Sequence, residues 1–136
     1  MFAHALIVSP LYVGLCALIF VVLSARVIRG RYRRQVNLGH GSHADLETAI
    51  RVHGNFAEYV PFALLVIVLI EAAGFSRYWV HVLGIALIVA RLAHAQGLGA
   101  AKQPSLGRIV GVTLTFAVLT VGGALLIWCF VRNRAF

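Results

Sequence analysis

Residues 47–62 read ETAIRVHGNFAEYVPF, and this stretch sets polar side chains at the head of a segment that is otherwise apolar enough to cross a membrane. The polar side chains are those of Arg51, His53, Asn55 and Glu58. A charge at bilayer depth costs at least about 2.5 to 3.5 kcal/mol, so charged residues there indicate a functional site with a partner. The stretch therefore predicts a transmembrane helix that contains a polar site.

The composition around this stretch is that of a small integral membrane protein. The chain has 136 residues, of which 61% are hydrophobic and 12% charged, and its mean hydropathy is +0.92. These values lie outside ordinary soluble usage and predict one membrane domain spanning residues 1–136. The formal net charge of +8 comes from bunched cations, which is typical of membrane topology, and no nucleic-acid partner is expected.

Four apolar runs predict the fold, an all-α integral membrane protein. They cover about residues 5–25, 49–73, 78–95 and 106–131. Each is close to the roughly 20 residues that a helix needs to cross about 30 Å of hydrocarbon. We expect an up-and-down bundle of four transmembrane helices in the lipid bilayer. The first run lacks the features of a cleaved signal peptide, so we expect it to be retained.

The basic residues predict the orientation. The first connection, residues 26–46, holds five arginines followed by a polar loop, which the positive-inside rule places in the cytoplasm. The third connection, residues 97–105, returns to that side with Lys102, whereas the second, residues 73–77, is a short hairpin on the other side. Both termini then lie outside, although Arg132 and Arg134 oppose this orientation. In a bacterium the protein would lie in the inner membrane with its site facing the cytoplasm.

The polar residues of the second helix form one stripe. Arg51, Asn55 and Glu58 fall within about 60° of one another on a helix. Arginine binds carboxylates, glutamate binds ammonium groups and asparagine binds either, so the stripe suits a zwitterionic ligand. The alternative is an Arg51–Glu58 pair that satisfies itself between helices. His53 points almost the opposite way, toward another helix or another subunit.

The other helices add cations at similar depth. Arg91 and His94 share a face at the end of the third helix, and the fourth begins with Arg108, followed by small residues that permit close helix contact. Together with Arg26 at the end of the first helix, they predict a pocket for a polyanionic ligand that opens to the cytoplasm. A guanidinium beside a thiol favours the nucleophilic thiolate. Neither Cys16 nor Cys129 is placed for this, so a thiol would come with the ligand. A zwitterionic thiol with two carboxylates describes glutathione.

Four motifs together point to one protein family. They are E-x-x-x-R-x-H-x-N-x-x-E-Y-x-P-F at residues 47–62, ARLAHAQG at 90–97, SAR at 24–26 and PSLGRIVG at 104–111. Through them the chain resembles the MAPEG family, the membrane-associated proteins of eicosanoid and glutathione metabolism. The resemblance implies a homotrimer that holds glutathione, its co-substrate, between neighbouring subunits at the cytoplasmic end.

The resemblance also implies a role for each matching residue. Glutathione contacts in one subunit would be Arg51, Asn55, Glu58 and Arg91, with His94 on the face of Arg91. The next subunit would contribute Arg26 and His53. Arg108 matches the thiolate-stabilising arginine of the family and is the candidate catalytic residue.

Departures from the family pattern narrow the expected activity. Leu98 and His94 stand where eicosanoid enzymes of the family carry tyrosines, and Ile109 stands where one branch has a serine. These differences favour a bacterial-type or microsomal-type glutathione transferase. Peroxidase activity on lipid hydroperoxides is a second activity that fits the same site. The other substrates of the enzyme would be lipophilic electrophilic small molecules.

Three other functions remain open from the sequence. One is a catalytically silent MAPEG-like protein that binds another anion. A second is a small proton-coupled transporter built around Glu58. A third is haem ligation by His53 and His94. No metal-ion site is expected.

Overall fold

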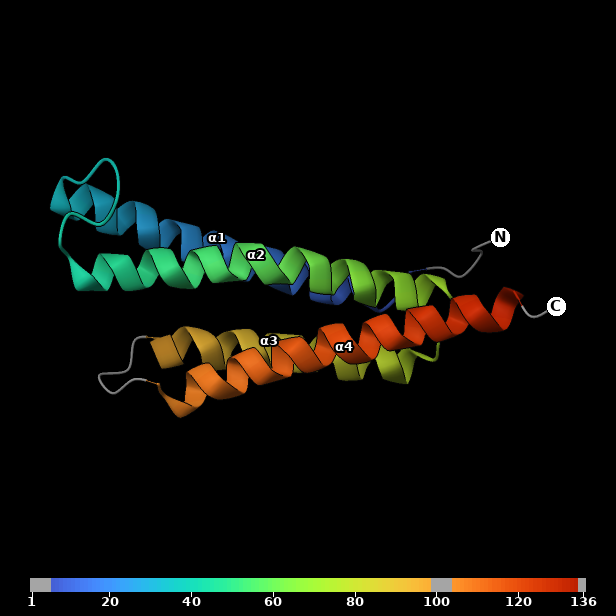
Figure 1. The fold of residues 1–136 in the computed structure, drawn as a ribbon. Helices are drawn as coiled ribbons and strands as arrows, with labels where there is room; N and C mark the ends of the chain where they lie inside the picture. The colour runs from blue at the N-terminus through green and yellow to red at the C-terminus, as the bar shows by residue number, and fades with distance from the viewer. Residues whose placement is uncertain (1–5, 99–103, 135–136) are drawn as a thin grey trace.

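The computed structural model describes residues 6–98 and 104–134, and it consists of four α-helices (Figure 1). They are α1 (Ser9–Arg34), α2 (Ala44–Ala72), α3 (Arg77–Leu98) and α4 (Leu106–Arg134). All four are long and apolar enough to cross a membrane. The prediction of four membrane-spanning helices is therefore confirmed.

The helices run up and down, with α2 in contact with all three others (Figure 1). Within the described ranges, α1 and α4 do not pack against each other. The end of α1, the start of α2, the end of α3 and the start of α4 all lie at one end of the bundle, which we call the loop end. Most of the arginines lie toward this end.

The boundaries of the first connection differ from the prediction. The arginine-rich segment is helical, so α1 continues to Arg34 and α2 already begins at Ala44. Hydropathy marks only the apolar part of a helix, whereas arginine is a good helix former and extends it into water. The helix ends where Gln35 takes a left-handed conformation with φ 55°. An ion pair between Arg34 and Asp45 ties the two helix ends together.

Glycines let α3 and α4 approach closely. A Cβ atom on Gly97 would lie 2.2 Å from the backbone nitrogen of Arg108, and one on Gly111 would lie 2.6 Å from Cβ of His94. Real Cβ atoms essentially never approach another atom so closely, so these positions have no room for a side chain. The small residues of the fourth helix therefore make the close contact that the sequence predicts.

At the other end of the bundle, Glu71 of α2 accepts hydrogen bonds from backbone N–H groups at the start of α1 and just before it. Its Oε1 atom accepts from Ile7 at 2.9 Å and from Val8 at 2.7 Å, and its Oε2 atom accepts from Ser9 at 2.7 Å. The first N–H groups of a helix have no partner within the helix and favour a negative charge. Glu71 therefore fixes the start of α1 against the end of α2.

Candidate functional site

Arg91 is the buried charge at the centre of the candidate site. It lies on α3 with 4% of its surface exposed. Its Nη1 atom donates to the backbone oxygen of Asn55 at 3.4 Å, and its guanidinium lies 5.9 Å from the centre of the Tyr59 ring. Its Nε atom has no hydrogen-bond partner in the described part of the chain.

No carboxylate of the described residues neutralises this guanidinium. Among the residues that the structure describes, the one ion pair joins Arg34 to Asp45, at the loop end. A buried charge without an opposite charge is costly, and the cost is offset when an anion binds to it. Arg91 is therefore suited to an anionic group supplied from outside the chain.

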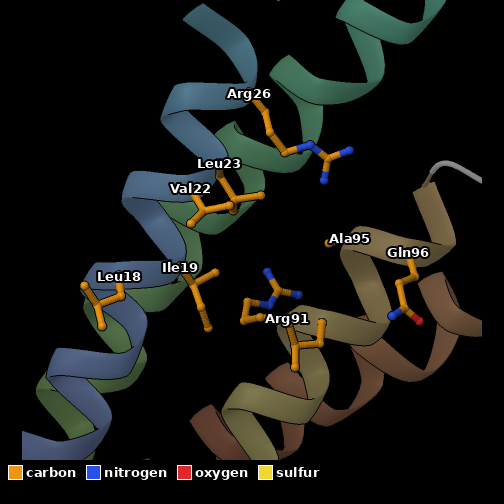
Figure 2. Close-up of a pocket in the computed structure, with 9 residues that line it drawn as sticks. Leu18, Ile19, Val22, Leu23, Arg26, Arg91, Ala95 and Gln96 are labelled. Atoms are coloured by element: carbon orange, nitrogen blue, oxygen red, sulfur yellow. The ribbon is translucent and has the colours of Figure 1, made fainter. Parts of the chain in front are cut away.

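A pocket of about 680 Å³ gives such a group access to Arg91 (Figure 2). This α1–α3 pocket has an apolar wall on α1 and polar side chains at its edges. Arg26 of α1 and Arg91 of α3 extend into the space between the two helices. Gln96 of α3 is a further polar lining residue. The remaining lining residues are Leu18, Ile19, Val22, Leu23, Leu92 and Ala95.

A much smaller cavity lies on the other side of Arg91. Its volume is about 30 Å³, room for about one water molecule, and it lies between α2, α3 and α4. Its polar lining includes Asn55, Tyr59, His94 and Thr115. Arg91 therefore separates the large pocket from a small polar space that also borders His94.

The polar stripe of α2 lies beside this small cavity. Asn55 is half-buried, and its Nδ2 atom donates to the backbone oxygen of Arg51 at 3.0 Å. Arg51 and Glu58 are exposed, and no ion pair joins these two described residues. The alternative of a self-satisfied Arg51–Glu58 pair is therefore absent. Both side chains remain available to a ligand or to a neighbouring chain.

His53 lies against α1 of its own chain. Its ring stacks on Phe20 with 4.8 Å between ring centres, and its Nε2 atom lies 3.1 Å from Oγ of Ser24. It thus faces away from Asn55, as the helical spacing predicts. That His53 and Arg26 serve a neighbouring subunit stays a prediction.

His94 and Arg108 lie where α3 meets α4. His94 is buried against the Gly111 turn of α4, within electrostatic range of both Arg91 and Arg108. Arg108 lies in the first turn of α4, where its backbone N–H donates to Oγ of Ser105 at 3.3 Å and its side chain is exposed. Arg108 does not line the α1–α3 pocket. His53 and His94 contact different helices, an arrangement that does not favour one haem between them.

Three contributors escaped the sequence-based prediction. Tyr59 lies one turn after Asn55 on the same face of α2, a spacing that could have added it to the stripe. Gln96 follows His94 by two residues as the next polar side chain of α3. Ser24 belongs to the SAR motif at residues 24–26, but the motif assigns it no role, because only the packing of α1 on α2 brings it to His53.

Two comparisons relate the chain to known proteins. A model of the MAPEG family matches residues 9–128. The inner membrane protein YecN of Escherichia coli strain K12 is 40% identical over 90 residues, which are 66% of this chain and 69% of that protein. YecN of E. coli O6:H1 strain CFT073 gives the same values. No solved structure matches the chain significantly.

Proposed function

Because the chain belongs to the MAPEG family, we propose that it is a membrane-bound glutathione transferase that activates the glutathione thiolate for attack on lipophilic electrophiles. Lipid hydroperoxides would be reduced by the same thiolate. We further propose that it works as a homotrimer, with the loop end and the glutathione site facing the cytoplasm and both termini outside.

The observation that supports this proposal best is the buried guanidinium of Arg91, which has no acidic partner among the described residues. Glutathione carries two carboxylates, and arginine binds carboxylates through charge-assisted hydrogen bonds. Arg26 lies exposed at the edge of the pocket of its own chain, and in the proposed trimer the copy from the neighbouring subunit supplies the second cation beside Arg91. The apolar wall that includes Leu18 and Val22, both well exposed, gives a lipophilic second substrate a path from the bilayer.

Each candidate residue has a distinct task in the proposed reaction. Arg91 and Arg26 hold carboxylates, while Glu58 receives the ammonium group of glutathione. Arg108 stabilises the thiolate after the thiol proton leaves to water. The sulfur then forms a bond to the electrophilic carbon, and the leaving group departs with the electron pair of the broken bond.

The remaining polar residues complete the proposed glutathione site. Asn55 and Arg51 offer further hydrogen bonds beside Glu58, and His94 lies next to Arg91. His53 would approach from the neighbouring subunit, together with that subunit's copy of Arg26, which is exposed at the mouth of the pocket.

Purified protein mixed with glutathione tests the proposal directly. We expect thiolate absorbance in the ultraviolet, conjugation of chlorodinitrobenzene, and loss of both in Arg108→Ala with glutathione binding retained. Arg77→Gln, an exposed cation at the opposite end of the bundle, is the control that should behave like the parent. Absence of thiolate and turnover in the parent would overturn the transferase proposal.

The homotrimer is tested by mixing two inactive variants. If glutathione lies between subunits, Arg91→Gln and Arg26→Gln chains expressed together regain binding, because some interfaces then hold both intact arginines. Each variant expressed alone should stay inactive. If no mixture binds glutathione, then each chain completes its own pocket and the shared site is wrong.

A second candidate is a catalytically silent protein that binds an anion in the same pocket. It is favoured by one observation, that Arg108 does not line the α1–α3 pocket. Glutathione binding that depends on Arg91 but produces neither thiolate nor conjugate would identify this function. Turnover that depends on Arg108 would exclude it.

A further inference from the structure

The α1 helix continues beyond the α1–α3 pocket with a row of arginines on the pocket face. Arg26, Arg29 and Arg33 are spaced i, i+3 and i+7 on one continuous helix, so they fall within about 60° of one another. Leu18 and Val22, which form the pocket wall, belong to the same face. From Arg26 to Arg33 the row rises about 10 Å toward the loop end.

The charges of this row are available, whereas the other two arginines of the segment are engaged. Arg31 donates from Nη1 to the backbone oxygens of Asn37 at 3.2 Å and Gly39 at 2.9 Å, and Arg34 pairs with Asp45. All three members of the row are exposed. Asp45 already pairs with Arg34, so it does not neutralise the row.

The row leads into the site rather than away from it. Figure 2 shows Arg26 nearer to the loop end than Arg91, with both guanidinium groups in the space between α1 and α3. Cations thus succeed one another from the exposed end of α1 to the buried Arg91. The apolar wall of α1, at residues 18–23, contains no carboxylate that would compete with an anionic ligand for these cations.

We propose that Arg29 and Arg33, with Arg26, form a track that draws anionic ligands such as glutathione from water into the α1–α3 pocket. The track rests on the proposed function, since it serves the same site. It acts on the approach of the ligand, and Arg91 acts on its retention. Charges that line a cleft with apolar walls raise association rates by about 10-fold to 1,000-fold.

The test compares two variants with the same loss of charge. Arg29→Gln/Arg33→Gln removes two cations from the track, and Arg77→Gln/Arg132→Gln removes two from the opposite end. Both are reconstituted in nanodiscs of neutral phosphatidylcholine. Stopped-flow fluorescence then measures association and dissociation of glutathione labelled with a dansyl group on its thiol, and calorimetry measures binding of unlabelled glutathione.

We expect the track variant to associate about 3-fold to 10-fold more slowly at low ionic strength, with its dissociation rate unchanged. The difference should shrink at about 0.15 M salt, where the screening length is about 8 Å. The control variant should match the parent. Calorimetry should show a loss of affinity equal to the loss in association rate.

The other outcomes separate the two proposals. A parent that binds glutathione and a track variant with the parent's association rate would overturn the track and leave the proposed function standing. An effect that appears only in nanodiscs containing phosphatidylglycerol would also overturn it, because the arginines would then act on lipid headgroups. Faster dissociation from the track variant would overturn it as well, because Arg29 and Arg33 would then be direct ligand contacts. A parent that binds neither probe would overturn the proposed function and the track together.

Discussion

Arg91 and Glu71 are two buried charges whose surroundings differ. Three backbone N–H groups point at the carboxylate of Glu71, so its charge is compensated within the chain. Arg91 has one long hydrogen bond and the face of an aromatic ring. The first arrangement serves the fold, and the second is suited to a ligand.

Replacing Arg91 should separate stability from binding. We expect Arg91→Met to keep or raise the melting temperature in detergent, because it removes a desolvated cation that no described carboxylate compensates. Glutathione binding, measured by calorimetry, should fall at least about tenfold. A melting temperature several degrees below that of the parent would contradict this and make Arg91 a structural residue.

Replacing Glu71 should have the opposite effect. Glu71→Gln keeps the shape but removes the charge from an acceptor of three N–H groups, so the free energy of unfolding should fall by about 1 to 3 kcal/mol. The measurement is unfolding in mixed micelles with increasing dodecyl sulfate. The matched control, Glu58→Gln, concerns an exposed carboxylate and should change stability by no more than about 0.5 kcal/mol. Equal effects of the two variants would contradict the role assigned to Glu71.

At the scale of elements, the close contact of α3 with α4 is what fixes Arg108 relative to His94. Gly111 touches the His94 turn, and the backbone of Arg108 lies against Gly97. Neither glycine has space for a methyl group. The geometry of the proposed catalytic arginine therefore depends on glycines that contact no ligand.

Two glycines of α4 provide a matched test of this contact. Gly111→Ala should lower the free energy of unfolding by about 1 to 3 kcal/mol, since its Cβ would lie 2.7 Å from the backbone oxygen of Ala90. Gly123→Ala should raise it by up to about 1 kcal/mol through helix propensity, because no described atom lies within 4 Å. Thermal unfolding of both variants checks the pair. Equal effects would show that the contact is not tight.

The helices also show what the sequence could predict and why the rest was missed. Apolar length identified four spans, and a 3.6-residue period identified the stripe of Arg51, Asn55 and Glu58. Hydropathy predicts that the first helix ends near residue 25, whereas α1 continues to Arg34, because hydropathy does not detect a helix that continues in water. The contact of Glu71 with Ser9 joins residues 62 positions apart, and the ring of Tyr59 reaches Arg91 only after α2 packs on α3. Neither contact can be predicted from a local sequence pattern, because the two partners of each lie on different helices.

At the scale of the whole molecule, the up-and-down arrangement puts the two kinds of connection at opposite ends (Figure 1). The connection at residues 35–43 lies at the arginine-rich loop end, whereas the turn at residues 73–76 lies at the end where α1 begins. The proposed orientation follows from this distribution of charge.

Cysteine labelling checks that orientation. In a chain with Cys16→Ala and Cys129→Ala, we expect Asn37→Cys to react with an impermeant maleimide in inverted membrane vesicles and not in intact spheroplasts. Ser76→Cys should show the reverse pattern, since both positions are exposed at opposite ends. If the two labelling patterns are exchanged, the protein has the opposite orientation. If both cysteines are labelled from the same side, the fold is contradicted.

The carboxylate that holds the start of α1 has a consequence for biosynthesis. Glu71 is translated 62 residues after Ser9, which at typical rates is a delay of roughly 3 to 12 s. During this interval the leading amides of α1 must be satisfied by water or lipid headgroups, because exposed N–H groups are not tolerated in hydrocarbon. We therefore expect the start of α1 to stay hydrated at the membrane surface until Glu71 reaches that end of the second helix, and the contact that joins the two helices forms only then.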